Sequence, residues 1–135
     1  MIKVFAKAEL PHFDSTRDTR DRLDLLTDDV PVDAQLMRAD RILYHPGDNG
    51  ASHAHPDCHH VFWVLAGTGI MHTDSGPTRL HAGMSVLVLP GETHWFENDG
   101  DENFSFVEFW APRPVAATVW TIVNDQCTWA PTVVS

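Results

Sequence analysis

The chain has 135 residues and a formal net charge of −10, with 9 Lys and Arg against 19 Asp and Glu. This length is expected to form one domain, and the acidity excludes nucleic acid and anionic membranes as partners, because both require a positive surface. No apolar run approaches the ~20 residues of a membrane helix. Residues 1–10 lack the apolar core of a signal peptide, and two cysteines make no disulfide framework, so we expect a cytoplasmic protein.

Short strands are predicted along most of the chain. Residues 1–8 are interpreted as a strand, and the acidic stretch 9–33 as solvated, with a short helical turn or strand around its leucines. Further strands are predicted over 34–44, 60–66, 69–74, 85–89, 94–97, 104–110 and 118–123. Strands of this length, separated by Gly, Pro, Asn and Asp, are typical of an all-β sandwich or barrel. We therefore predict one β domain over residues 34–135, preceded by an N-terminal extension over residues 1–33.

Eight of the nine histidines lie between His45 and His94. His53 and His55 are two residues apart, so they point to the same side of an extended chain. His60 and His94 each open a predicted strand. Neutral imidazoles from neighbouring strands could converge on one divalent ion, and imidazole suits Fe, Zn, Cu, Ni and also Mn. For an isolated His-x-His pair, two exposed or hydrogen-bonded histidines on a loop would be the better interpretation.

The segment 47–67 resembles the first motif of the cupin superfamily, G-x5-H-x-H-x4-E-x6-G. Gly47, His53, His55 and Gly67 match in place, and His60 occupies the position of the family's Glu. Cupins with four histidine ligands exist, so this departure does not argue against metal binding.

The segment 83–98 resembles the second cupin motif, G-x5-P-x-G-x2-H-x3-N. Gly83, Gly91, His94 and Asn98 match in place, and Pro90 stands one position late. The resemblance implies an all-β, double-stranded β-helix or jelly-roll barrel. It also implies one divalent metal ion, with the ligands His53, His55, His60 and His94.

Two adjacent histidines compete for the third ligand position. On a strand, His59 and His60 face opposite ways. Counting back from Gly67 selects His60, whereas counting three residues on from His55 selects His59. We favour His60, because strand 60–66 then sets the inward face.

Several aromatic residues are candidates for the pocket around the ion, although core packing is the better explanation for each of them taken singly. If His60 points inward, Phe62 shares its face, and Phe96 shares that of His94. Strand 104–110 has two possible inward sets, and the sequence leaves both open: Phe104, Phe106, Glu108 and Trp110, or Ser105, Val107 and Phe109. The predicted pocket comprises Phe62, Phe96, Phe104, Phe106 and Tyr44. Glu108 is the one candidate for a catalytic base.

The ligand set implied by the resemblance leads to three hypotheses. Four neutral ligands leave the full dipositive charge on the ion, which favours a small anionic substrate bound through two oxygen atoms. The first hypothesis is a non-haem metal-dependent oxygenase for an enolisable or phenolic compound, with Fe(II) favoured over Zn, Mn, Ni or Cu. The second is an isomerase, cyclase or lyase that uses the ion as a Lewis acid. The third is a non-catalytic module that binds a small ligand.

The resemblance also bears on assembly. Single-domain cupins are commonly dimers, with the N-terminal segment often packing on the partner. We therefore expect a homodimer in which residues 1–33 contact the other subunit.

Overall fold

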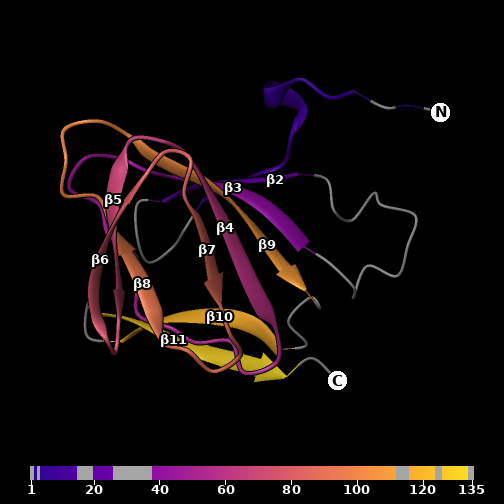
Figure 1. Cartoon of the computed structure of the whole chain (residues 1–135). Helices are drawn as coiled ribbons and strands as arrows, with labels where there is room; N and C mark the ends of the chain where they lie inside the picture. The colour runs from indigo at the N-terminus through magenta and orange to yellow at the C-terminus, as the bar shows by residue number, and fades with distance from the viewer. Residues whose placement is uncertain are drawn as a thin grey trace.

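The computed structural model describes residues 2, 4–14, 20–25, 38–111, 116–123 and 126–133. These residues are almost entirely β-structure (Figure 1). The strands are β1 (His12–Asp14), β2 (Asp21–Asp24), β3 (Arg38–Tyr44), β4 (His59–Ala66), β5 (Thr68–Thr73), β6 (Gly76–His81), β7 (Ser85–Val88), β8 (His94–Glu97), β9 (Phe104–Ala111), β10 (Ala116–Val123) and β11 (Gln126–Val133). A single 3-10 turn, η1 (Lys7–Glu9), is the one helical element of the described part. Within it, no helix is long and apolar enough to span a membrane.

The strands form two larger sheets and a hairpin. The six-stranded sheet has the order β1-β2-β3-β9-β4-β7, the three-stranded sheet has the order β6-β5-β8, and β10 pairs with β11. Figure 1 shows β5, β6 and β8 together on one flank, facing the strands β3, β4, β7 and β9. Two antiparallel sheets facing one another confirm the predicted all-β, double-stranded β-helix architecture.

Most predicted strands are present, with ends that shift by a few residues. The predicted strand over 1–8 is wrong: described residues before Lys7 are irregular, and η1 follows them. Residues 34–37 lie outside the described residues. Strands β1, β6 and β11 were not predicted. In β6, Pro77 and Arg79 obscure the alternation, and the strand is held instead by its pairing with β5 from Thr68↔His81 to Thr73↔Gly76.

Part of the predicted N-terminal extension joins the sheet of its own chain. Strand β2 pairs with β3, with Asp24 opposite Asp40. The Arg22 guanidinium donates two hydrogen bonds, of 3.0 and 2.7 Å, to Oδ2 of the fully buried Asp40. Asp24 is also buried. The interpretation of this stretch as simply solvated is therefore wrong at β2.

The core lies between the two sheets and is rich in aromatic rings. The register places Ile42, Phe106 and Val64 in one row across β3, β9 and β4, and Tyr44 opposite Phe104 in another. All five side chains are buried. Gly67 belongs to the first motif and has φ of +75°, and a Cβ there would collide with the carbonyl oxygen of Asn103. This position therefore requires glycine.

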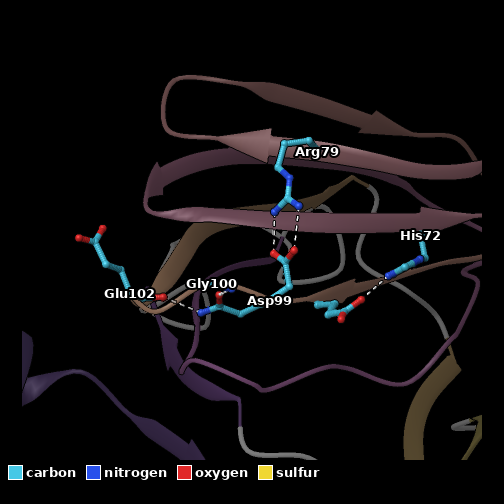
Figure 2. A network of polar contacts seen from close by, with 7 residues as sticks. His72, Arg79, Asp99, Gly100 and Glu102 are labelled. Atoms are coloured by element: carbon cyan, nitrogen blue, oxygen red, sulfur yellow. Dashed lines mark hydrogen bonds and ion pairs between the residues drawn. The ribbon is translucent and has the colours of Figure 1, made fainter.

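Polar contacts hold the outside of the three-stranded sheet and the turn after β8 (Figure 2). The Arg79 guanidinium donates to both Asp99 oxygens at 2.6 and 2.8 Å, and His72 Nε2 lies 2.7 Å from Glu97 Oε2. The buried Asn98 side chain donates to the carbonyl oxygens of Tyr44 and Glu102 at 3.0 and 2.7 Å. The motif asparagine thus ties the turn after β8 to the end of β3.

Candidate metal centre

The two motif segments are paired with one another. His53 and His94 exchange both backbone hydrogen bonds, at 3.1 and 2.9 Å, and Gly91 N donates to His55 O at 2.8 Å. Directly opposed residues of an antiparallel pair carry their side chains on the same side. The rings of His53 and His94 accordingly lie 4.4 Å apart, centroid to centroid.

The other two predicted ligands complete a cluster of rings. His55 lies 5.1 Å from His53, 5.4 Å from His60 and 6.2 Å from His94. His60 comes from the opposite sheet and lies 5.7 Å from His94. His60 is buried and His59 is exposed, so His60 is the member of the adjacent pair that lies within the cluster.

The cluster is neutral at physiological pH. Burial, followed by the neighbouring histidines, lowers the pKa of His55 to about 4. Burial lowers the pKa of His94 to about 4 and that of His60 to about 3. Burial and the adjacent His94 also hold the pKa of His53 well below its ordinary value. Neutral imidazole is the form that binds metal ions.

Backbone carbonyls set the tautomers of two of these rings. His53 Nδ1 lies 2.8 Å from Ala51 O, and His94 Nδ1 lies 3.1 Å from Glu92 O. Because a carbonyl oxygen only accepts hydrogen bonds, Nδ1 is the donor and the lone pair of each neutral ring is on Nε2. His94 Nε2 is buried and has no partner. A buried acceptor without a partner costs about 1–3 kcal/mol, a cost that a bound cation would offset.

A buried carboxyl group adjoins the cluster. Glu108 is 5% exposed, and its Oε2 lies 3.2 Å from His60 Nε2. Burial raises the pKa of Glu108, while the positive charges of Arg22 and Arg20 act in the opposite direction. The inward set of β9 is therefore Phe104, Phe106, Glu108 and Trp110, whereas Phe109 is exposed.

The four histidine rings are spaced as ligands of one divalent ion would be, although their nitrogen atoms do not meet at one point. With a metal–nitrogen distance of about 2.1 Å, ligand rings at right angles around one ion have centroids ~4.5 Å apart and opposite rings ~6.4 Å apart. The ring separations of 4.4–6.2 Å lie in this range. Within the described residues, however, no three His, Cys, Asp or Glu side chains form a closed ligand set. In the same cluster, His60 Nε2 faces Glu108, while His60 Nδ1 is buried without a partner.

The five aromatic residues predicted to line the pocket lie in two parts of the interior. Phe62 touches the cluster, with its ring 4.1 Å from His60 and 5.9 Å from His94, and Phe96 lies 6.2 Å from His94. Further along the interior, the remaining three pack on one another and on Phe96; they are Tyr44, Phe104 and Phe106. Their role in binding a substrate stays a prediction.

Two residues at the site were absent from the predicted set. Trp110 stacks on His60 at 4.5 Å, and its buried Nε1 has no partner. The Arg22 guanidinium lies 5.8 Å from the Trp110 ring. The sequence groups Trp110 with Glu108 in one of the two possible inward sets of β9 without including it in the predicted pocket, and nothing in the acidic N-terminal stretch marks Arg22. Cys58 is buried, and burial and Asp57 raise the pKa of its thiol to about 12, which makes it a poor metal ligand.

Comparison with known protein families shows which family the chain belongs to. Residues 41–110 match the cupin domain. This segment covers more than half of the chain and contains all four clustered histidines together with Glu108. The protein belongs to the cupin family, and cupins commonly bind a divalent metal ion.

Solved structures with the same fold are only distantly similar in sequence. One is a predicted oxalate decarboxylase from Thermotoga maritima, with a TM-score of 0.71, 19% identity and coverage of 82% of this chain and 99% of that chain. Another is the polyketide cyclase RemF from Streptomyces resistomycificus, with a TM-score of 0.73, 16% identity and coverage of 84% and 81%. A third is an uncharacterized double-stranded beta-helix protein from Klebsiella pneumoniae, with a TM-score of 0.65, 24% identity and coverage of 96% and 98%. No curated protein matches the sequence. At these identities the likeness shows the fold alone.

Proposed function

We propose that this cupin is a metal-dependent enzyme that acts on a small anionic substrate bound through two oxygen atoms. The ligands of the ion are His53, His55, His60 and His94. The observation that carries the proposal is the buried Glu108 carboxyl group, 3.2 Å from His60 in a cluster of neutral histidines. Burying a carboxyl group in a protein interior costs free energy. The position of Glu108 beside the candidate ligands suits it to a role in the reaction.

The chemistry we favour is proton transfer. A bound divalent ion supplies Lewis acidity, which polarises the oxygen atoms of a chelated substrate. Glu108 Oε2 takes a proton from the substrate and returns it, and the contact with His60 Nε2 orients the carboxyl group for this task. Phe62 and Phe96 keep water from the histidine rings that they contact. This division of roles suits an isomerase, cyclase or lyase.

The names of two similar structures agree with this class, although they show only the fold. One is the polyketide cyclase RemF, and another is a sugar phosphate isomerase from Silicibacter pomeroyi, with a TM-score of 0.70 and 13% identity. Imidazole ligands leave the choice among Fe(II), Zn, Mn, Ni and Cu open.

An oxygenase is the second candidate. An all-imidazole ligand set suits Fe(II), and the aromatic surroundings of the cluster favour a small apolar gas as co-substrate. In this reaction dioxygen is consumed. A non-catalytic module, the third candidate, has no use for Glu108 beyond packing.

The test uses protein loaded in turn with Fe(II), Zn and Mn, and a panel of diketones, hydroxy-ketones, catechols and hydroxy-acids. Under anaerobic conditions in D2O, proton NMR follows exchange of substrate C–H and formation of an isomer or cyclised product. We expect exchange with at least one compound, and loss of about 100-fold or more in rate in Glu108→Gln. His81→Gln, a change at an exposed histidine, is the matched control.

Two other outcomes would contradict the proposal. Turnover only with dioxygen identifies the oxygenase. Tight binding of a panel compound with neither exchange nor oxygen uptake identifies the non-catalytic module.

A further inference from the structure

Trp110 carries a buried hydrogen-bond donor beside the histidine cluster. It is 7% exposed, and its Nε1 has no hydrogen-bond partner among the residues that the structure describes. An indole N–H can only donate, and a donor that leaves water on folding without gaining an acceptor destabilises the protein. An acceptor atom supplied by a bound molecule restores the missing hydrogen bond.

The indole ring of Trp110 is in direct contact with candidate metal ligands. It stacks on His60 with centroids 4.5 Å apart and 23° between the ring planes, and it meets His55 edge-on at 6.0 Å. In the register of β4 and β9, Trp110 is opposite His60, and two residues along Glu108 is opposite Phe62. An acceptor at Trp110 Nε1 therefore belongs to a molecule that lies beside the metal ligands.

Two arginines at the start of β2 place positive charge near this donor. Arg20 and Arg22 are two residues apart, so their side chains share one face of the strand, and Arg22 is opposite the buried Ile42. The Arg22 guanidinium lies 5.8 Å from the Trp110 ring. Burial raises the pKa of Glu108, and the positive charges of Arg22 and then Arg20 are the largest electrostatic influences on that pKa. The surroundings of the indole N–H therefore favour an anionic acceptor.

The fold holds both guanidinium groups in place. Arg22 Nε and Nη2 donate to Oδ2 of the fully buried Asp40 at 3.0 and 2.7 Å. The Arg20 guanidinium lies 5.8 Å from the Tyr44 ring, and its Nη2 is 3.1 Å from the position that a Cβ on Gly50 would take. Because these side chains are already ordered, binding an anion beside them costs little conformational entropy.

We propose that Trp110 Nε1 donates a hydrogen bond to a carboxylate of the substrate, beside the positive charge of Arg22. This inference rests on the proposed function, in which two other oxygen atoms of the substrate bind the ion. It names the substrate class as a chelating acid with a second carboxylate. Because the indole ring stacks directly on His60, only a short spacer separates this carboxylate from the chelating oxygen atoms. The 2-hydroxy-dicarboxylates have this form.

Calorimetric titration of the full chain loaded with Zn tests this class. The probes are malate and 2-hydroxyglutarate, each compared with the monoacid in which a methyl group replaces the second carboxylate, 2-hydroxybutyrate and 2-hydroxyvalerate. At least one diacid is expected to bind about tenfold or more tightly than its monoacid, because a hydrogen bond to a charged group is stronger than a methyl contact. Trp110→Phe keeps an aromatic ring and removes the N–H. It is expected to raise the Kd of the diacid by about tenfold and to leave that of the monoacid unchanged.

Nuclear magnetic resonance of the nitrogen-15-labelled, Zn-loaded protein observes the donor itself. The chain has five tryptophans, and the indole N–H signal that is missing in Trp110→Phe belongs to Trp110. A bound diacid is expected to move this signal downfield, as a new hydrogen bond does. Trp95→Phe is the matched control, because the Trp95 ring stacks on His72 at 4.9 Å outside the cluster. This variant is expected to keep the preference for the diacid.

Equal affinity for diacids and monoacids would overturn the inference, and so would a preference that Trp110→Phe leaves unchanged or the failure of all four compounds to bind. Failure of the proposed function gives a different result. A protein that binds a diacid through Trp110 but exchanges no substrate C–H retains this carboxylate site and is not the proposed enzyme. Substrate C–H exchange together with equal affinity for diacids and monoacids keeps the enzyme and removes the carboxylate site.

Discussion

The interior of this barrel has two ends that are equally buried and chemically unlike. At one end, Tyr44, Phe104 and Phe106 are at most 1% exposed and pack ring against ring. At the other, His60 and His94 are at most 2% exposed, yet each keeps a ring nitrogen without a partner, and so does Trp110. Folding explains the first end, because apolar burial stabilises the protein. It does not explain the second, where polar atoms are desolvated without compensation, and this contrast supports the proposal of a metal site at the histidine end.

The largest expected effect concerns stability in the metal-free protein. Phe104→Ala should lower the free energy of unfolding by about 3–5 kcal/mol, because it leaves a cavity in a close-packed core. His94→Leu should cost less than about 1 kcal/mol or stabilise the protein, because removal of the buried Nε2, which has no partner, offsets the lost contact between Nδ1 and Glu92 O. Urea denaturation in the presence of a chelator measures both. Equal losses would mean that the two ends are the same kind of core.

Metal content should distinguish two adjacent histidines. His60→Ala should weaken metal binding by more than the ~10–100-fold typical of losing a group that merely orients a ligand. His59→Ala should leave binding unchanged, because this side chain is exposed on the opposite face of β4. Elemental analysis of protein purified without a chelating resin, followed by competition with a chromophoric chelator, gives both values. Loss of metal in His59→Ala alone would overturn the ligand assignment.

The stability of the metal-free protein should also depend on pH. Because the pKa values of His60 and His94 are lowered to about 3 and about 4, the unfolded chain takes up protons first as the pH falls below 6.5. The metal-free protein should therefore lose stability between pH 6.5 and about 4, by about 1.4 kcal/mol per pH unit for each such histidine. Glu108 acts in the opposite direction: its raised pKa provides stability that is lost as the pH rises above 4.5.

Urea denaturation at several pH values in the presence of a chelator measures this slope. His60→Asn should reduce it, whereas His81→Asn, at an exposed position, should leave it unchanged. A stability independent of pH across this range would contradict the neutral, buried cluster.

Local sequence patterns accounted for the strands that alternate clearly and for the histidine motifs. β4 was evident because His60, Phe62 and Val64 alternate with Val61 and Trp63, and β8 because its segment follows a Pro-Gly turn. β6 was not, since Pro77 and Arg79 break the pattern and the strand exists through pairing with β5. Such pairing depends on residues far along the chain, which a short window of sequence does not contain.

The sequence by itself determined the cupin family, the all-β class and the four histidines, because these depend on residue types at fixed spacing. The tertiary structure decided which face of β9 points inward, and so it brought Glu108 to His60 and Trp110 onto the same ring. It also placed Arg22 beside Asp40 within a stretch that looked like solvated surface. The physical reason is that a strand's period of two residues defines two faces but does not say which is buried. That choice depends on which strands pair and on what the opposite sheet presents to them.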